Sequence, residues 1–186
     1  FDVVALGESL IDFTLNGTNA QGIELFARNP GGAPANVLAM NARLGGKTAF
    51  IGKVGKDGFG DFLRQTLVES SIDVSGLVID EKIPTTLAFV QLDSKGDRSF
   101  PFYRNPGADV ILTSAEVNRN LIDDAAIFHF KCNNRILCHI FYLLFSMPFG
   151  TGIISSYFNG FSRIRKEGAI FAGVSVDFCS QMGYSR

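Results

Sequence analysis

The 186 residues carry a formal net charge of −1 and a pI near 6.1, so no strong field of either sign would attract nucleic acid or an anionic membrane surface. A chain of this length predicts one domain, alone or with a small appendage. Its three cysteines lack a disulfide-like spacing, and its start lacks a secretion signal, which together favour the cytoplasm. This composition suits a small neutral or polar partner.

The first half of the chain predicts alternating strands and helices. The apolar run from Val3 to Leu6 ends at Gly7 and predicts a buried strand. Residues Ala33 to Leu44 predict a helix, because Pro34 stands in the first turn and Gly45 follows the end. The pattern is typical of an α/β protein.

A second strand and helix follow directly. Thr48 to Val54 form another apolar run, and Asp57 is placed to cap a helix. The apolar residues of that helix fall on one face at helical spacing: Phe59, Phe62, Leu63 and Leu67.

The period of the pattern then changes to two. Residues Thr85 to Arg104 alternate as a β-hairpin with a turn at 93–96. Thr113 to Glu116 read as a capping box, which predicts a helix reaching about Asp123, and Ala126 to Phe130 predict the next core strand. We therefore expect a main α/β sheet that carries a small β flap.

The character of the chain shifts after Phe130. Residues 136–162 contain no charged side chain, yet Pro148 and several polar residues interrupt the apolar run, which disfavours a membrane span. Two imidazoles and two thiols lie close in sequence, but their spacing fits no zinc motif, so no metal site is predicted at His129, Cys132, Cys138 and His139.

One short string carries the clearest sign of a binding site. In Gly31-Gly32-Ala33-Pro34-Ala35-Asn36 two glycines let the backbone approach a ligand, and the start of a helix offers unpaired N–H groups. The amide of Asn36 can both donate to and accept from a hydroxyl. Taken alone, the string fits a plain turn and helix start equally well.

Five strings in chain order resemble the N-terminal signature of the PfkB, or ribokinase-like, sugar kinases. The resemblance covers about residues 2–130, and a sixth string is similar to a segment that marks fructokinases within the family. The five are Gly7 to Asp12, Pro30 to Asn36, Ala42 to Gly45, Phe50 to Gly55 and Asp57 to Gly60; the sixth is Phe102 to Asp109.

The resemblance implies a mainly parallel sheet flanked by helices, with a β lid built from about residues 10–30 and 85–104. It implies that residues 1–130 are the sugar-binding half of the domain. Residues 131–186 are then a divergent or aberrant tail, such as a frame shift would produce. The residues implied to bind the sugar are Asp12, Gly31, Gly32, Asn36 and Arg104.

The implied activity is ATP-dependent phosphorylation of a sugar's primary hydroxyl, with fructose favoured, although ribose, ketodeoxygluconate and adenosine kinases share this front half. ATP and Mg²⁺ are implied as cofactors, but the family's catalytic aspartate stands in a Gly-Ala-Gly-Asp turn, and these 186 residues contain no such string. We therefore expect no catalytic residue and no assignable cofactor-binding residue here, and negligible turnover by this chain alone.

Two alternatives stay open beside the kinase interpretation. One is a sugar-binding or dimerising remnant without catalysis, and the other is a membrane-associated product of the uncharged stretch. Lids in this family often pair between subunits, which implies a homodimer through the lid.

Overall fold

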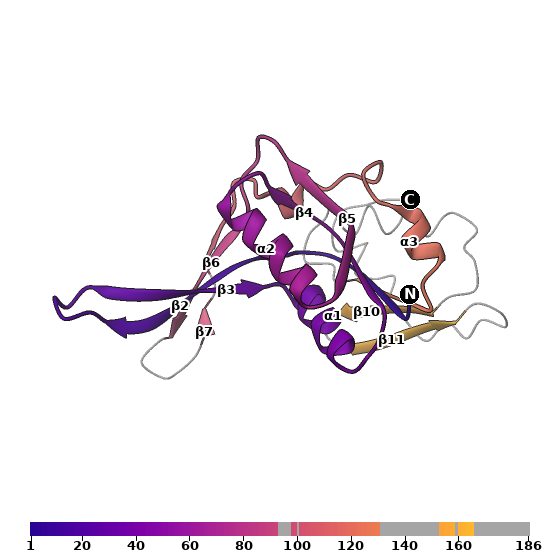
Figure 1. The fold of residues 1–186 in the computed structure, drawn as a ribbon, viewed down its shortest axis with the longest axis horizontal. Coiled ribbons are helices and arrows are strands. Elements are labelled where there is room, and N and C mark those ends of the chain that lie inside the picture. The colour runs from indigo at the N-terminus through magenta and orange to yellow at the C-terminus, as the bar shows by residue number, and fades with distance from the viewer. Residues whose placement is uncertain (93–97, 100, 131–152, 159, 166–186) are drawn as a thin grey trace, which may run out of the picture.

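The computed structural model describes residues 1–92, 98–99, 101–130, 153–158 and 160–165. These residues form two sheets, a main sheet with helices packed against it and a second sheet from which a long hairpin projects (Figure 1). The turn predicted at 93–96 lies outside the described residues, as do Cys132, Cys138 and His139.

The main sheet is predominantly parallel, as predicted. Its strand order is β11-β10-β9-β1-β4-β5, and each neighbouring pair is parallel except β10 with β11. Its strands are β1 (Val3–Leu6), β4 (Thr48–Gly55), β5 (Ile72–Asp80), β9 (Ile127–Phe130), β10 (Ile153–Phe158) and β11 (Gly160–Arg165).

Both predicted helices of the first half are confirmed. Helix α1 (Ala33–Arg43) has a proline in its first turn, and Gly45 follows it with φ +90°, a conformation that glycine adopts readily. Helix α2 (Gly58–Glu69) is capped by Asp57, whose side chain accepts from the amides of Phe59 at 3.1 Å and Gly60 at 2.8 Å.

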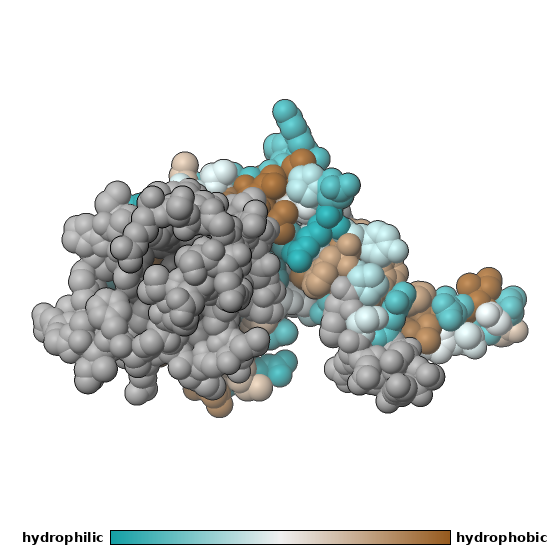
Figure 2. Space-filling model, turned by 180° about the vertical axis from the view of Figure 1, so that it is seen from behind, coloured by the Kyte–Doolittle hydropathy of each residue, from teal (hydrophilic) through white to brown (hydrophobic). Residues whose placement is uncertain are grey.

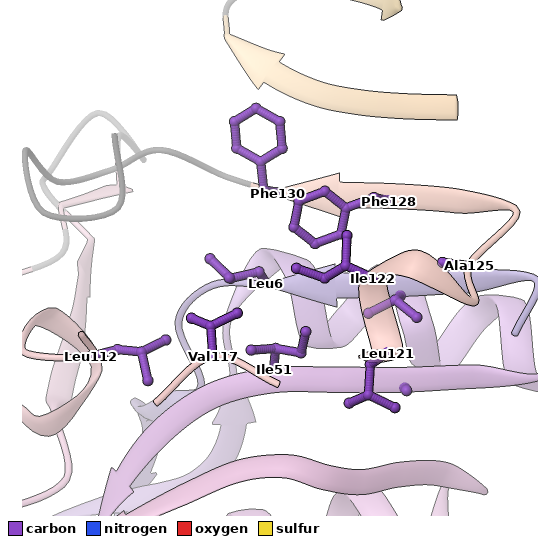
Figure 3. Packing of buried hydrophobic residues seen from close by; sticks show 11 residues of the cluster. Leu6, Ile51, Leu112, Val117, Leu121, Ile122, Ala125, Phe128 and Phe130 are labelled. Carbon is purple, nitrogen blue, oxygen red and sulfur yellow. The ribbon is translucent and has the colours of Figure 1, made fainter. Parts of the chain in front are cut away.

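The core lies on both faces of the main sheet because alternate residues of each strand point to opposite sides. Val3 and Ala5 of β1 pack under α1 in one cluster that includes Leu38. Val4 and Leu6 belong to a second cluster, which the segment from Leu112 to Ala125 covers and to which Phe128 and Phe130 of β9 contribute (Figure 3).

The second sheet has the order β3-β2-β6-β7, with β8 also paired to β6. Strands β2 and β3 form the antiparallel hairpin that projects from the body, and β6 with β7 and β8 confirms the predicted hairpin of the later segment (Figure 1). The bounds are β2 (Leu10–Thr18), β3 (Glu24–Gly31), β6 (Leu87–Leu92), β7 (Arg98–Ser99) and β8 (Phe102–Tyr103). We call this second sheet the lid.

The helix predicted from Thr113 to Asp123 is wrong at its start. Half of the capping box forms, since the Glu116 carboxylate accepts from the Thr113 amide at 2.8 Å, while the Thr113 hydroxyl donates to the same carboxylate at 2.8 Å. Helix α3, however, spans only Arg119–Asp123. The Glu116 carboxylate also pairs with Lys53 of β4 at 2.7 Å, so this turn is bound to the sheet instead of continuing into a helix.

The uncharged stretch is described only in part. Residues 131–152 lie outside the described residues, while β10 and β11 extend the main sheet beyond β9. Within the described residues, no helix has the length and apolar character needed to cross a membrane.

Candidate functional site

One face of the lid gathers two of the predicted site residues. Asp12 of β2 lies opposite Ala88 of β6, which in turn lies opposite Phe102 of β8. Residues directly opposite one another on paired strands point to the same face of a sheet. The Arg104 guanidinium carbon lies 4.3 Å from the centroid of the Phe102 ring, so Asp12 and Arg104 belong to one face, which we call the Asp12 face.

The Asp12 carboxylate lies against the backbone of Gly31, where β3 runs into α1. A Cβ atom added to Gly31 would stand 2.3 Å from Asp12 Oδ2, so glycine leaves the space that the carboxylate occupies. Burial raises the pKa of the Asp12 carboxyl above its ordinary value. The structure thus places a partly desolvated acceptor beside the start of a helix.

Gly32 and Asn36 shape that helix start. Gly32 has φ +113°, and a Cβ there would stand 2.3 Å from the Glu8 carbonyl oxygen, so the position needs glycine. Its carbonyl accepts from the backbone amide of Asn36 at 3.1 Å. No side chain caps α1, which leaves its first N–H groups for another partner, and the Asn36 side chain is exposed beside them.

Arg104 is not a free cation. Its Nη1 donates to Asp109 Oδ2 at 3.2 Å, and about a quarter of the side chain is exposed. Asp109 is buried and also accepts from the Thr86 hydroxyl. Asp109 lies within the fructokinase-like segment, but its residue pattern indicates no role for it, because its burial arises only in the folded chain.

A cavity of about 280 Å³ runs between α1 and α2. Gly31 and Asn36 line it, whereas Asp12, Gly32 and Arg104 do not. The predicted residues are therefore not gathered around this one cavity. Asp12 packs on Gly31 beside Gly32 and the start of α1, whereas Arg104 shares only the Asp12 face of the lid. The other lining residues are Ser9, Pro30, Ala35, Ala39, Met40, Arg43, Leu63, Thr66, Leu67, Ser70 and Ile72.

The resemblance to sugar kinases implies ATP and Mg²⁺ as cofactors. The described residues contain no group of three or more His, Cys, Asp or Glu side chains that could hold a metal ion. The carboxylates of Asp80 and Glu116 are already paired with Lys53 at 2.9 and 2.7 Å. No residue is assigned to either cofactor here.

The resemblance to sugar kinases implies that Asp12 binds the sugar, so Gly31→Ala is expected to weaken sugar binding because the new methyl group must displace the Asp12 carboxylate. Overpacking of this kind costs about 1–3 kcal/mol, so we expect a rise of roughly 5- to 150-fold in Kd for fructose by calorimetry. Gly58→Ala is the matched control, because a Cβ at Gly58 meets nothing within 4 Å. Equal fructose affinity in the Gly31 variant and the control would contradict the packing of Asp12 on Gly31.

Comparison with known proteins places this chain in a family. The model of the pfkB family carbohydrate kinases matches residues 1–140. Fructokinase-1 of Oryza sativa subsp. japonica is 50% identical over 130 residues, which cover 69% of this chain and 40% of that protein. Fructokinase-2 of Solanum lycopersicum is 47% identical, with the same shares covered. The chain thus spans about 40% of the length of these curated relatives.

Solved structures agree with the sequence relatives. A crystal structure of fructokinase from Xylella fastidiosa matches with a TM-score of 0.76 and 34% identity, over 85% of this chain and 50% of that one. A second structure of that enzyme, with bound ATP, matches with a TM-score of 0.74. With a family model that covers three quarters of its length, a parallel sheet and a lid in the expected order, the chain belongs to the pfkB family of carbohydrate kinases.

Proposed function

We propose that this chain supplies the sugar-binding part of an ATP-dependent, fructokinase-like kinase that phosphorylates a primary hydroxyl of the sugar. The supporting observation is the Asp12 carboxylate, which is packed on Gly31 beside the uncapped start of α1. The fructokinase relatives support fructose as the sugar. The cysteine spacing supports a cytoplasmic location.

Each residue of the site has a distinct part in this proposal. The two oxygens of Asp12 accept from neighbouring sugar hydroxyls, and bonds to a carboxylate are roughly twice as strong as neutral ones. The Asn36 amide adds a donor and an acceptor, and Gly31 and Gly32 let the ring approach the backbone. Bound ATP would supply the phosphoryl group, while the lid keeps water from competing with the sugar hydroxyl.

Calorimetry and a coupled ADP-release assay test this proposal together. We expect the chain to bind fructose, to bind ribose at least about tenfold more weakly, and to release no ADP from MgATP in the presence of fructose. The absence of hexose binding would overturn the sugar-binding assignment. ADP release that depends on fructose would overturn the expectation that this chain alone is inactive.

Fructose binding is expected to weaken as the pH falls through the raised pKa of Asp12. The ionised carboxylate is the form that accepts two hydroxyl bonds, and burial raises its pKa, so binding should begin to fail above the ordinary aspartate value of about 3.9. Kd measured by calorimetry from pH 7.5 to pH 4 checks this dependence. A Kd that stays constant over that range would contradict the role of the ionised form.

The opposite face of the lid supports a homodimer. Phe13 and Phe89 stack at 5.1 Å, and Phe89 also contacts Tyr103 and Phe26, which are 65% and 43% exposed. Hydrophobic residues are visible along the projecting hairpin (Figure 2). A second copy of the lid would cover this aromatic face.

The homodimer is tested by light scattering during gel filtration. Phe26→Asp is expected to give a monomer, because it would bury a charge in the apolar contact. Val68→Asp on α2, which is also half-exposed, should leave the dimer intact. A wild-type chain that is monomeric at about 100 μM, a concentration at which dimers of ordinary interface affinity form, would overturn the homodimer.

A further inference from the structure

A buried carboxylate lies where the chain enters and leaves the lid. Thr86 directly precedes β6, and Arg104 directly follows β8. Asp109 accepts hydrogen bonds from both side chains and is only 4% exposed. The Asp109 side chain, which lies outside the lid, thus connects the segment before β6 to the segment after β8.

The turn that carries Asp109 packs closely against Thr86 and Arg104. A Cβ atom at Gly107 would stand 1.8 Å from Thr86 Oγ1 and 2.9 Å from Arg104 Cβ, so glycine alone lets these groups meet. The amide of Ala108 donates to the Pro84 carbonyl at 2.9 Å, which fixes the turn to the segment that enters the lid. A backbone contact therefore holds the turn that carries Asp109, and the carboxylate itself is held by the Thr86 and Arg104 side chains.

The ion pair restrains Arg104 without using up its hydrogen-bonding capacity. A guanidinium has five N–H donors, and the bond to Asp109 uses one of them. Its plane is also held over the Phe102 ring. A long side chain loses considerable rotamer entropy when it is fixed, and a restraint present before the ligand arrives removes that cost from binding.

We propose that Asp109 is a positioning residue that holds the Arg104 guanidinium on the Asp12 face, so that sugar affinity depends on a carboxylate that does not touch the sugar. The inference rests on the proposed function and adds to it a contact between the Arg104 guanidinium and the sugar, which the family resemblance implies. Asp109 acts on the sugar through Arg104 alone. If Asp109 acted on the sugar only by stabilising the turn and Thr86, its removal would instead change sugar affinity by the same factor whether or not Arg104 is present.

A double-mutant cycle separates these two roles. Fructose Kd is measured by calorimetry for the wild type, Asp109→Asn, Arg104→Met and the double variant. We expect each single substitution to raise Kd about tenfold, as loss of a bond to a charged group does, and the double variant to match Arg104→Met alone. If Asp109→Asn raises Kd by the same factor in the Arg104→Met background, the positioning role is overturned.

Two further measurements distinguish the restraint on Arg104 from a general loss of stability. Thr86→Val removes the other bond to Asp109 but leaves the ion pair, so it should lower the unfolding midpoint while fructose Kd stays within about threefold. Hydrogen exchange of the Tyr103 and Arg104 amides without sugar should speed up in Asp109→Asn, and unchanged exchange would overturn the restraint. If the wild type binds no hexose, the proposed function fails, whereas the exchange result still decides whether Asp109 restrains Arg104.

Discussion

Asp12→Asn is expected to raise the fructose Kd about 100-fold. The asparagine keeps one acceptor oxygen but loses the charge and the second acceptor. Hydrogen bonds to charged groups are worth about 1.5–3 kcal/mol each, so weakening two of them removes about 3 kcal/mol of binding free energy. Calorimetric titration with fructose measures the change, and a Kd within about threefold of the wild type would contradict the role of Asp12.

The same substitution should not destabilise the fold. Burial raises the pKa of Asp12, so the native state binds its proton more tightly than the unfolded chain does, and stability from this group is lost as the pH rises through that pKa. At pH 7 the ionised carboxylate therefore costs stability, and asparagine relieves that cost. Weaker sugar binding with an equal or higher unfolding midpoint is the expected combination.

Asp123→Asn is the matched control for this experiment. Asp123 ends α3 and is exposed. Helix α3 lies on the opposite side of the body from the β2–β3 hairpin (Figure 1). It should change neither fructose affinity nor the unfolding midpoint measurably. A similar loss of affinity in both variants would point to a general electrostatic effect instead of a contact.

Local sequence signals predicted the helices that have a capping residue, a proline or a glycine at their ends. Helix α1 has a proline at its start and a glycine after its end, and α2 has the Asp57 cap. Strands β1 and β4 are buried along their whole length, so they read as continuous apolar runs. In each case the residue pattern and the tertiary environment agree.

Strands β2, β3 and β5, which residue patterns alone did not predict, combine buried and exposed positions. Strand β5 has buried, intermediate and exposed positions without regular alternation, and its residue pattern predicts no strand. Most of β2 and β3 is exposed, so their apolar alternation is weak and only the family resemblance indicated them. The false start of α3 arose because Lys53, 63 residues away in sequence, binds Glu116.

The candidate site was predictable to a similar extent. The residue types alone indicated Gly31, Gly32 and Asn36, because they lie in one short string. Two glycines at the start of a helix are recognisable there as a place where a ligand can approach the backbone. The pairing of Arg104 with Asp109 depends on a compact turn at Gly107 and on Thr86, which come together only in the folded chain. Buried polar partners of this kind leave no periodic signal in the sequence.

Lys53→Met is expected to be the most destabilising single change in the described part of the protein outside the apolar core. The Lys53 ammonium is 7% exposed and bridges Asp80 of β5 at 2.9 Å and Glu116 at 2.7 Å. Methionine fills a similar volume but leaves two neighbouring carboxylates without their cation. Breaking a buried pair costs about 3–5 kcal/mol, and because Glu116 stays 31% exposed we expect about 2–3 kcal/mol by urea unfolding at pH 7.

The pH dependence of that loss identifies its cause. Lys53, with help from the amides of Ile83 and Lys82, lowers the pKa of Asp80 to about 2. A lowered native pKa contributes stability above the unfolded value of about 3.9 and loses it as the pH falls through about 2. The difference in the free energy of unfolding between the wild type and Lys53→Met should therefore become smaller as the pH falls from about 4 towards 2, where Asp80 takes up its proton.

Lys56→Met tests whether the effect belongs to the buried pair. Lys56 also contacts a carboxylate, that of Glu81 at 2.8 Å, but both side chains are about two-thirds exposed. Solvent and salt screen such a pair, so this substitution should leave the unfolding midpoint almost unchanged. If both lysine variants lost the same free energy of unfolding, the cause would be the removal of one positive charge from the protein. The burial of Lys53 between β4, β5 and the turn at Thr113 would then not be what stabilises this end of the sheet.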